Sequence, residues 1–131
     1  MANVPGSPFD DLIGTEWLSD DPGDARGRVP FRDDLRQPYG LLHGGVYSTL
    51  VESVCSRATA IAVWADGSIT FGQALEISLL RPATGGAEVR ARARHRGRTT
   101  WVWEAEVRDD EDNLCALAKM TMAVRPRPRS D

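Results

Sequence analysis

The stretch from Val46 to Val63 limits the possible folds of this chain more than any other part of it. Nearly every residue in the stretch is apolar or small, and only Glu52 and Arg57 carry a charge. A helix of this composition belongs in the middle of a domain rather than on its surface. Because an unpaired charge inside such a helix is costly, the sequence predicts that Glu52 is buried. There it either pairs with an arginine or belongs to a functional site.

The start of this predicted helix is also unusual. His43, Gly44 and Gly45 directly precede the apolar run, where serine, threonine or aspartate is the more common cap. Two glycines remove side chains from the positive end of the helix dipole, where unpaired backbone N–H groups point outward. Such an end can hold an anion or a developing oxyanion. The alternative is that the glycines only relieve crowding in a tight turn, but the nearby histidine and helix carboxylate favour a site.

A spacing of polar and glycine residues connects these features. Ser56 follows Glu52 by one helical turn and lies on the same face, where it could orient the carboxylate or a water molecule, or simply allow close packing. Gln37 precedes His43 by six residues. The order glutamine, His-Gly-Gly, acidic residue, serine resembles the acyl-CoA thioesterases of the hotdog fold. The resemblance is to the branch of this family that contains the phenylacetate-pathway thioesterases and one type of 4-hydroxybenzoyl-CoA thioesterase. It covers residues 9–126.

The resemblance implies a role for each of these residues. Glu52 would be the catalytic carboxylate, which attacks the thioester carbon or activates a water molecule. The Gly44 N–H would donate to the oxyanion. Gln37 and His43 would bind and polarise the thioester, although loop hydrogen bonding and helix capping are the alternatives for these two. In this family the site lies at a dimer interface, with Gln37 and Gly44 from one chain and Glu52 from the other.

Other residues are candidates for contact with the substrate. The predicted substrate-binding residues are Gly45, Tyr47 and Trp64. Tyr47 and Trp64 flank the two ends of the helix, and we expect them to line an acyl slot. The arginines that alternate over residues 90–96, with Arg98, suit the phosphates of CoA. The more common explanation for such a row is the solvent face of a sheet.

Alternating apolar and polar residues predict strands around the helix. One strand is expected before the helix, over residues 25–32, where Pro30 implies an edge position or irregular pairing. Four strands should follow, over residues 69–80, 88–96, 100–108 and 114–124. An antiparallel sheet that covers one apolar helix curls around it. The predicted fold is therefore a single α+β hotdog domain over residues 9–125, between a flexible N-terminus (1–8) and a disordered tail (126–131).

Composition excludes several other classes of protein. The net charge is −3, and the basic residues do not gather into a basic domain, so we expect no nucleic-acid partner. No apolar run is long enough to span a membrane, and no signal peptide is recognisable, so a cytoplasmic location is expected. Cys55 and Cys115 are predicted to be small core residues. With only two histidines and no ligand cluster, the sequence predicts no metal and no cofactor.

The predicted function is hydrolysis of an aryl or medium-chain acyl-CoA. The thioester of an acyl carrier protein is a second possible substrate. A hotdog dehydratase would need a Phe-Pro-Gly-His type of stretch, which is absent. A non-catalytic module that binds acyl-CoA is the alternative from another class, and Glu52 argues against it. We expect a homodimer or a dimer of dimers (a homotetramer), because a single curled sheet leaves its edges open.

Overall fold

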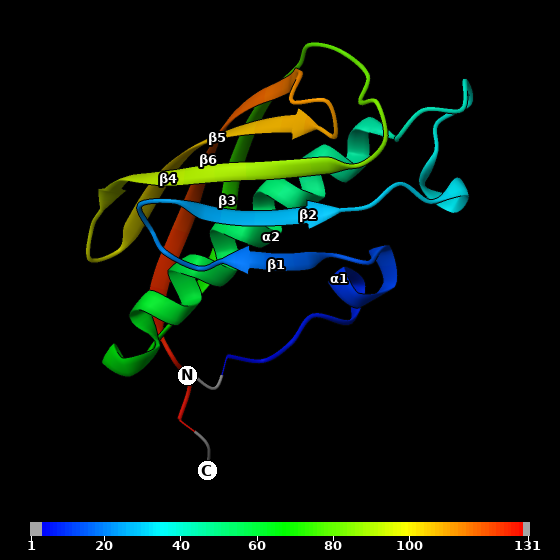
Figure 1. Ribbon diagram of the computed structural model, residues 1–131. Coiled ribbons are helices and arrows are strands. Elements are labelled where there is room, and N and C mark those ends of the chain that lie inside the picture. The colour runs from blue at the N-terminus through cyan, green and yellow to red at the C-terminus, as the bar shows by residue number, and fades with distance from the viewer. Residues whose placement is uncertain (1–3, 130–131) are drawn as a thin grey trace.

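The computed structural model describes residues 4–129 and contains one long helix and six strands (Figure 1). The elements before the long helix are α1 (Pro8–Ile13), β1 (Glu16–Ser19), β2 (Ala25–Val29) and the short 3₁₀ helix η1 (Asp33–Leu35). The long helix is α2 (Gly44–Val63), followed by the 3₁₀ helix η2 (Trp64–Asp66). The remaining strands are β3 (Ser68–Leu79), β4 (Ala87–Arg96), β5 (Thr100–Asp109) and β6 (Leu114–Pro126).

The six strands form one antiparallel sheet in the order β1-β2-β4-β5-β6-β3, which curls around α2 (Figure 1). This confirms the predicted α+β hotdog fold. The prediction of an edge position for the strand before the helix is wrong, because β2 lies between β1 and β4. The strand ends at Val29, so Pro30 stands outside the hydrogen-bonded ladder and does not disturb it. The edge strands are β1 and β3.

The core lies between the inner face of the sheet and one side of α2. Leu50, Val51, Val54 and Cys55 of α2 are at most 2% exposed. The chain needs a glycine at position 27, because a Cβ there would lie 2.6 Å from a methyl group of Val54. Helix and sheet therefore pack closely, as the small residues of α2 allow.

The two cysteines are free and buried, in agreement with their predicted place in the core. Burial raises the pKa of the Cys55 thiol above its ordinary value. A protonated thiol is a poor nucleophile, so Cys55 serves packing rather than chemistry.

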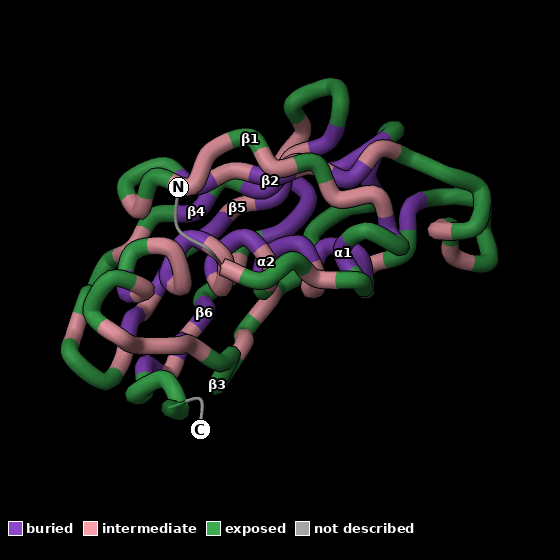
Figure 2. Tube along the Cα trace, turned by 90° about the horizontal axis from the view of Figure 1, so that it is seen from below, coloured by how far each residue is buried: buried purple, intermediate pink, exposed green. Residues whose placement is uncertain are grey.

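The other side of α2 is not covered by the sheet (Figure 2). Glu52 is exposed there, and Ser53 and Ser56 are half-buried. The predicted burial of Glu52 is therefore wrong for the single chain. The reason is that one sheet layer can cover only one side of a helix, whereas the composition of α2 is apolar or small nearly all round.

The chain ends show two further features. α1 begins at Pro8, one residue before the predicted start of the domain, and Ser7 caps it. At the other end, Arg127 donates hydrogen bonds to the backbone of Gly67 and Trp64. Within residues 4–129, no helix is both long enough and apolar enough to cross a bilayer.

Candidate active site

The first turn of α2 leaves one backbone donor open. His43 is the N-cap: its Nδ1 accepts the Gly45 N–H at 2.8 Å, and its carbonyl oxygen accepts the Val46 N–H at 2.9 Å. The Gly44 N–H makes no hydrogen bond with any residue in the described part of the chain. It therefore points outward at the positive end of the helix dipole, where an oxyanion can bind.

His43 both caps the helix and keeps a free donor. Because Nδ1 accepts a hydrogen bond, we infer that the neutral imidazole carries its hydrogen on Nε2. This group can donate to a ligand beside Gly45. The capping alternative considered for His43 is thus a second role that does not compete with substrate binding.

Gln37 lies in the loop before α2, beside the open donor. Its side-chain oxygen accepts the N–H groups of Tyr39 and Leu41, which confirms the loop hydrogen bonding considered for this residue. Its NH₂ group makes no hydrogen bond within residues 4–129 and remains available. Gln37 and Gly44 line the same concavity of about 280 Å³.

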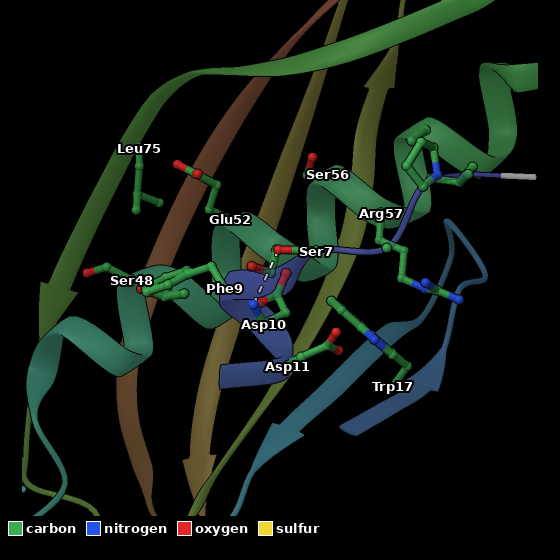
Figure 3. A pocket seen from close by; sticks show the side chains of 16 residues that line it. Ser7, Phe9, Asp10, Asp11, Trp17, Ser48, Glu52, Ser56, Arg57 and Leu75 are labelled. Atoms are coloured by element: carbon green, nitrogen blue, oxygen red, sulfur yellow. Dashed lines mark hydrogen bonds between the residues drawn. The ribbon is translucent and has the colours of Figure 1, made fainter. Parts of the chain in front are cut away.

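Glu52 lies in a different cavity, of about 440 Å³ (Figure 3). Among residues 4–129 its carboxylate has no hydrogen bond and no ion pair, so the alternative of an arginine partner is wrong. The nearest arginine along the helix, Arg57, instead pairs with Asp20 at 3.0 Å and lies over the ring of Trp17. Both oxygens of Glu52 are therefore available for chemistry.

Ser56 lines the Glu52 cavity, as their shared helix face predicts. No hydrogen bond joins the two side chains in this chain. Sequence reasoning missed one neighbour of the Glu52 carboxylate: β3 passes close to it at Gly72, next to a β-bulge. A glycine inside a predicted strand was the available signal, because it indicates a bulge or a close approach.

The candidate residues do not meet in one chain. Gly44 and Glu52 are eight residues apart on α2, roughly 12 Å along its axis. They line separate cavities, and His43 and Gly45 line a third of about 340 Å³. No group of three or more metal-ligating side chains occurs within the described ranges.

The two aromatic residues predicted to line an acyl slot are also far apart. Tyr47 is buried, its hydroxyl accepts the Ala83 N–H at 2.7 Å, and burial raises its pKa. Trp64 lies in η2, roughly 25 Å away along the helix axis, with the Arg127 guanidinium 4.2 Å from its ring centroid. The structure does not bring Tyr47 together with Trp64, but Tyr47 lines the concavity that contains Gln37 and Gly44.

Comparisons with known proteins agree with this fold. The family described as the Thioesterase superfamily matches residues 39–116. An inferred esterase of Haemophilus influenzae is 31% identical over 113 residues, covering 86% of this chain and 76% of that protein. A mutant thioesterase from Pseudomonas aeruginosa has a crystal structure with a TM-score of 0.84 at 32% identity, over 90% of this chain and 86% of that one. The E. coli PaaI protein from the phenylacetic acid degradation operon shares the fold, with a TM-score of 0.81 at 20% identity, over 95% and 88%.

Fold and comparisons together define a hotdog-fold hydrolase of thioesters. The chain belongs to the Thioesterase superfamily, because the family match spans more than half of it and a relative 31% identical covers most of it. The predicted resemblance is thereby confirmed.

Proposed function

We propose that the protein is an acyl-CoA thioesterase that hydrolyses aryl or medium-chain acyl-CoA to the free acid and CoA. The proposal rests on Glu52, whose carboxylate has no partner among residues 4–129 and which lines a cavity of about 440 Å³. Cavities of a few hundred Å³ are typical of small-molecule sites. An unpaired carboxylate in such a cavity serves catalysis better than it serves stability.

In the first version of the mechanism, Glu52 is a general base. It takes a proton from water while the water oxygen bonds to the acyl carbon. The resulting oxyanion accepts a hydrogen bond from the Gly44 N–H. The carbon–sulfur bond then breaks, and the departing thiolate takes up the proton, while His43 and Gln37 donate hydrogen bonds to the thioester.

In the second version, Glu52 is the nucleophile. One of its oxygens bonds to the acyl carbon, the carbon–sulfur bond breaks, and the thiolate takes a proton from solvent, which the later attack of water on the anhydride returns. Water then cleaves the anhydride, which releases the acid and restores the carboxylate. The Ser56 hydroxyl, in the same cavity, can orient the water in either version.

Both versions require two chains. Gly44 and Glu52 lie too far apart within one chain, so we propose a homodimer or a dimer of dimers in which each site uses both. The edge strand β3 supports this, because its outer side is unpaired in the described chain and it carries the exposed side chains Phe71 and Leu79. Open, apolar edges invite pairing with another chain.

The test is Glu52→Gln, with Glu111→Gln as the matched control. Glutamine is nearly isosteric but cannot act as base or nucleophile, so we expect kcat to fall at least about 100-fold. Because Glu52 is exposed, the melting temperature should stay close to that of the wild type. Glu111 is exposed in the turn between β5 and β6, rather than on β3, and does not line the cavity, so its substitution should leave kcat unchanged.

Two results would contradict the proposal. A near-normal kcat in Glu52→Gln would exclude the mechanism. A wild-type protein that binds acyl-CoA without releasing any thiol would favour the alternative, a non-catalytic binding module.

A further inference from the structure

The cavity that contains Glu52 has two walls of different character (Figure 3). The wall from α2 is polar and small, and includes Ser48, Thr49, Ser53 and Ser56. The opposite wall comes from residues 4–11 and from β1, where the aromatic rings of Phe9 and Trp17 lie among the polar side chains of Ser7, Asp10 and Asp11. Leu75 of β3 adds an aliphatic side chain. The cavity therefore has polar groups on both sides, and its aromatic surface is confined to Phe9 and Trp17.

Phe9 is held in place although its side chain is 56% exposed. The Ser7 hydroxyl accepts the Asp10 N–H at the start of α1, and Gly14 ends the helix in the left-handed conformation. Ile13 is buried in the core. Both ends of α1 are thus fixed, and the exposed surface of Phe9 is available for a ligand to cover.

Trp17 is fixed by a different set of contacts. The Arg57 guanidinium lies 4.9 Å from its ring centroid, and Arg57 itself pairs with Asp20 at 3.0 Å. A cation over an aromatic face is attractive. The ring therefore has a defined position at the wall of the cavity.

Phe9 also connects two concavities. It lines the Glu52 cavity and the neighbouring one that contains His43 and Gly45. An acyl group bound in the first cavity would therefore meet the Phe9 ring on the way towards the start of α2.

We propose that Phe9 and Trp17 form the acyl-binding wall of the site and set its preference for aryl and medium-chain acyl groups over acetyl. The thioester would face Glu52 and the serines, and the acyl tail would cover the two rings. The inference rests on the proposed function. It concerns residues that precede those matched by the family, 39–116.

The experiment compares kcat/KM for octanoyl-, benzoyl- and acetyl-CoA in the wild type and in Phe9→Ala. Loss of apolar contact in a substrate pocket costs at least about tenfold, so we expect that fall for octanoyl- and benzoyl-CoA. For acetyl-CoA, which is too short to cover the ring, the change should stay below about threefold. Leu12→Ala is the matched control, because Leu12 is on the same helix, is 68% exposed and does not line the cavity.

A second measurement tests Trp17. In Glu52→Gln, binding of octanoyl-CoA without turnover should change the tryptophan fluorescence, and the added substitution Trp17→Phe should remove that change. An equal fall of kcat/KM for all three substrates in Phe9→Ala, or unchanged selectivity, would overturn the proposed wall. A wild-type protein that hydrolyses none of them would instead overturn the proposed function, so the two failures can be told apart.

Discussion

At the scale of single residues, the position of the Glu52 carboxylate depends on the absence of a side chain at Gly72. A Cβ at position 72 would lie 3.3 Å from the Glu52 carboxylate and 2.9 Å from the end of the Met120 side chain. Met120 is flexible and can move, but any shift of the carboxylate alters the site. We expect Gly72→Ala to lower kcat by about tenfold or more, because small displacements of a catalytic group cost up to about 100-fold. Steady-state kinetics and the melting temperature are the measurements.

Gly27→Ala is the matched control for this prediction. Its Cβ would meet Val54 at 2.6 Å, on the core side of α2. We therefore expect a lower melting temperature with unchanged kcat per folded protein. If Gly72→Ala gave that same pattern, Gly72 would be a packing residue without influence on Glu52.

The sequence correctly predicted which residues lie together where helical spacing alone determines it. Glu52 and Ser56 share a cavity because residues one turn apart share a face. Gly72 carried a signal as a glycine inside a predicted strand, but its approach to Glu52 could not be predicted, because that depends on how β3 packs against α2. The exposure of Glu52 was mispredicted for a related reason: hydrophobicity along a helix does not say which side a single sheet leaves open.

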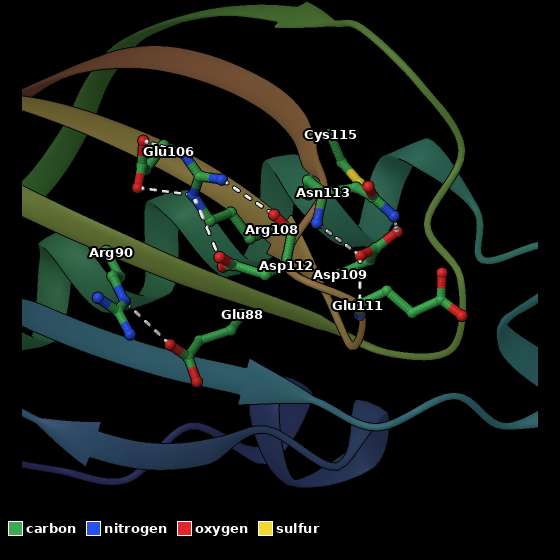
Figure 4. A network of polar contacts seen from close by, with 9 residues as sticks. All are labelled: Glu88, Arg90, Glu106, Arg108, Asp109, Glu111, Asp112, Asn113 and Cys115. Carbon is green, nitrogen blue, oxygen red and sulfur yellow. Dashed lines mark hydrogen bonds and ion pairs between the residues drawn. The ribbon is translucent and has the colours of Figure 1, made fainter.

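At the scale of elements, Asp109 at the end of β5 joins the turn before β6 to the loop before β4 (Figure 4). Its carboxylate accepts N–H groups from Thr84, Glu111 and Asn113 at 2.9 to 3.0 Å, and the Asn113 side-chain amide at 3.1 Å. Burial works against the ionised form, but these hydrogen bonds outweigh it and lower the pKa of Asp109 to about 2.

We expect Asp109→Asn to lower the free energy of unfolding by about 1–3 kcal/mol at pH 7, because one of the two acceptor oxygens becomes an NH₂ group and its donors are left without an acceptor. The folded-state pKa lies below the ordinary value of 3.8, so the ionised group stabilises the fold above that pH. This stabilisation is lost as the pH falls from about 4 towards 2. Urea unfolding at several pH values should therefore show a difference between wild type and variant that shrinks over this range. A constant difference would contradict the assignment.

The longer elements were predictable because their patterns are local. Helix α2 and the four strands after it agree with the expected ranges within a few residues. The neighbours of β2 were not predictable, since they depend on pairing between distant segments. The edge position inferred from Pro30 was wrong because proline constrains only the strand that contains it, and β2 ends one residue earlier. Irregular pairing, the other expectation, occurs between β2 and β1, where the register shifts.

At the scale of the whole molecule, the proposed site is divided between two chains. The open Gly44 N–H and the open Glu52 carboxylate line separate cavities of one chain. A symmetric dimer would place the Gly44 N–H of each chain beside the Glu52 carboxylate of the other and so form two sites, because an isologous interface uses the same surface on both subunits. Light scattering should therefore show a dimer or a larger assembly, and a fully active monomer would contradict the divided site.

Mixing two inactive variants tests this division directly. Glu52→Gln lacks the carboxylate, and Gln37→Ala lacks the amide donor that lies beside Gly44. In a mixed dimer with a divided site, one site combines both defects and the other is intact. After subunit exchange of equal amounts, about a quarter of the wild-type rate should return, since half of the dimers are mixed and each has one working site. If Gln37 and Glu52 served the same site within one chain, every site in every dimer would keep a defect and no activity would return.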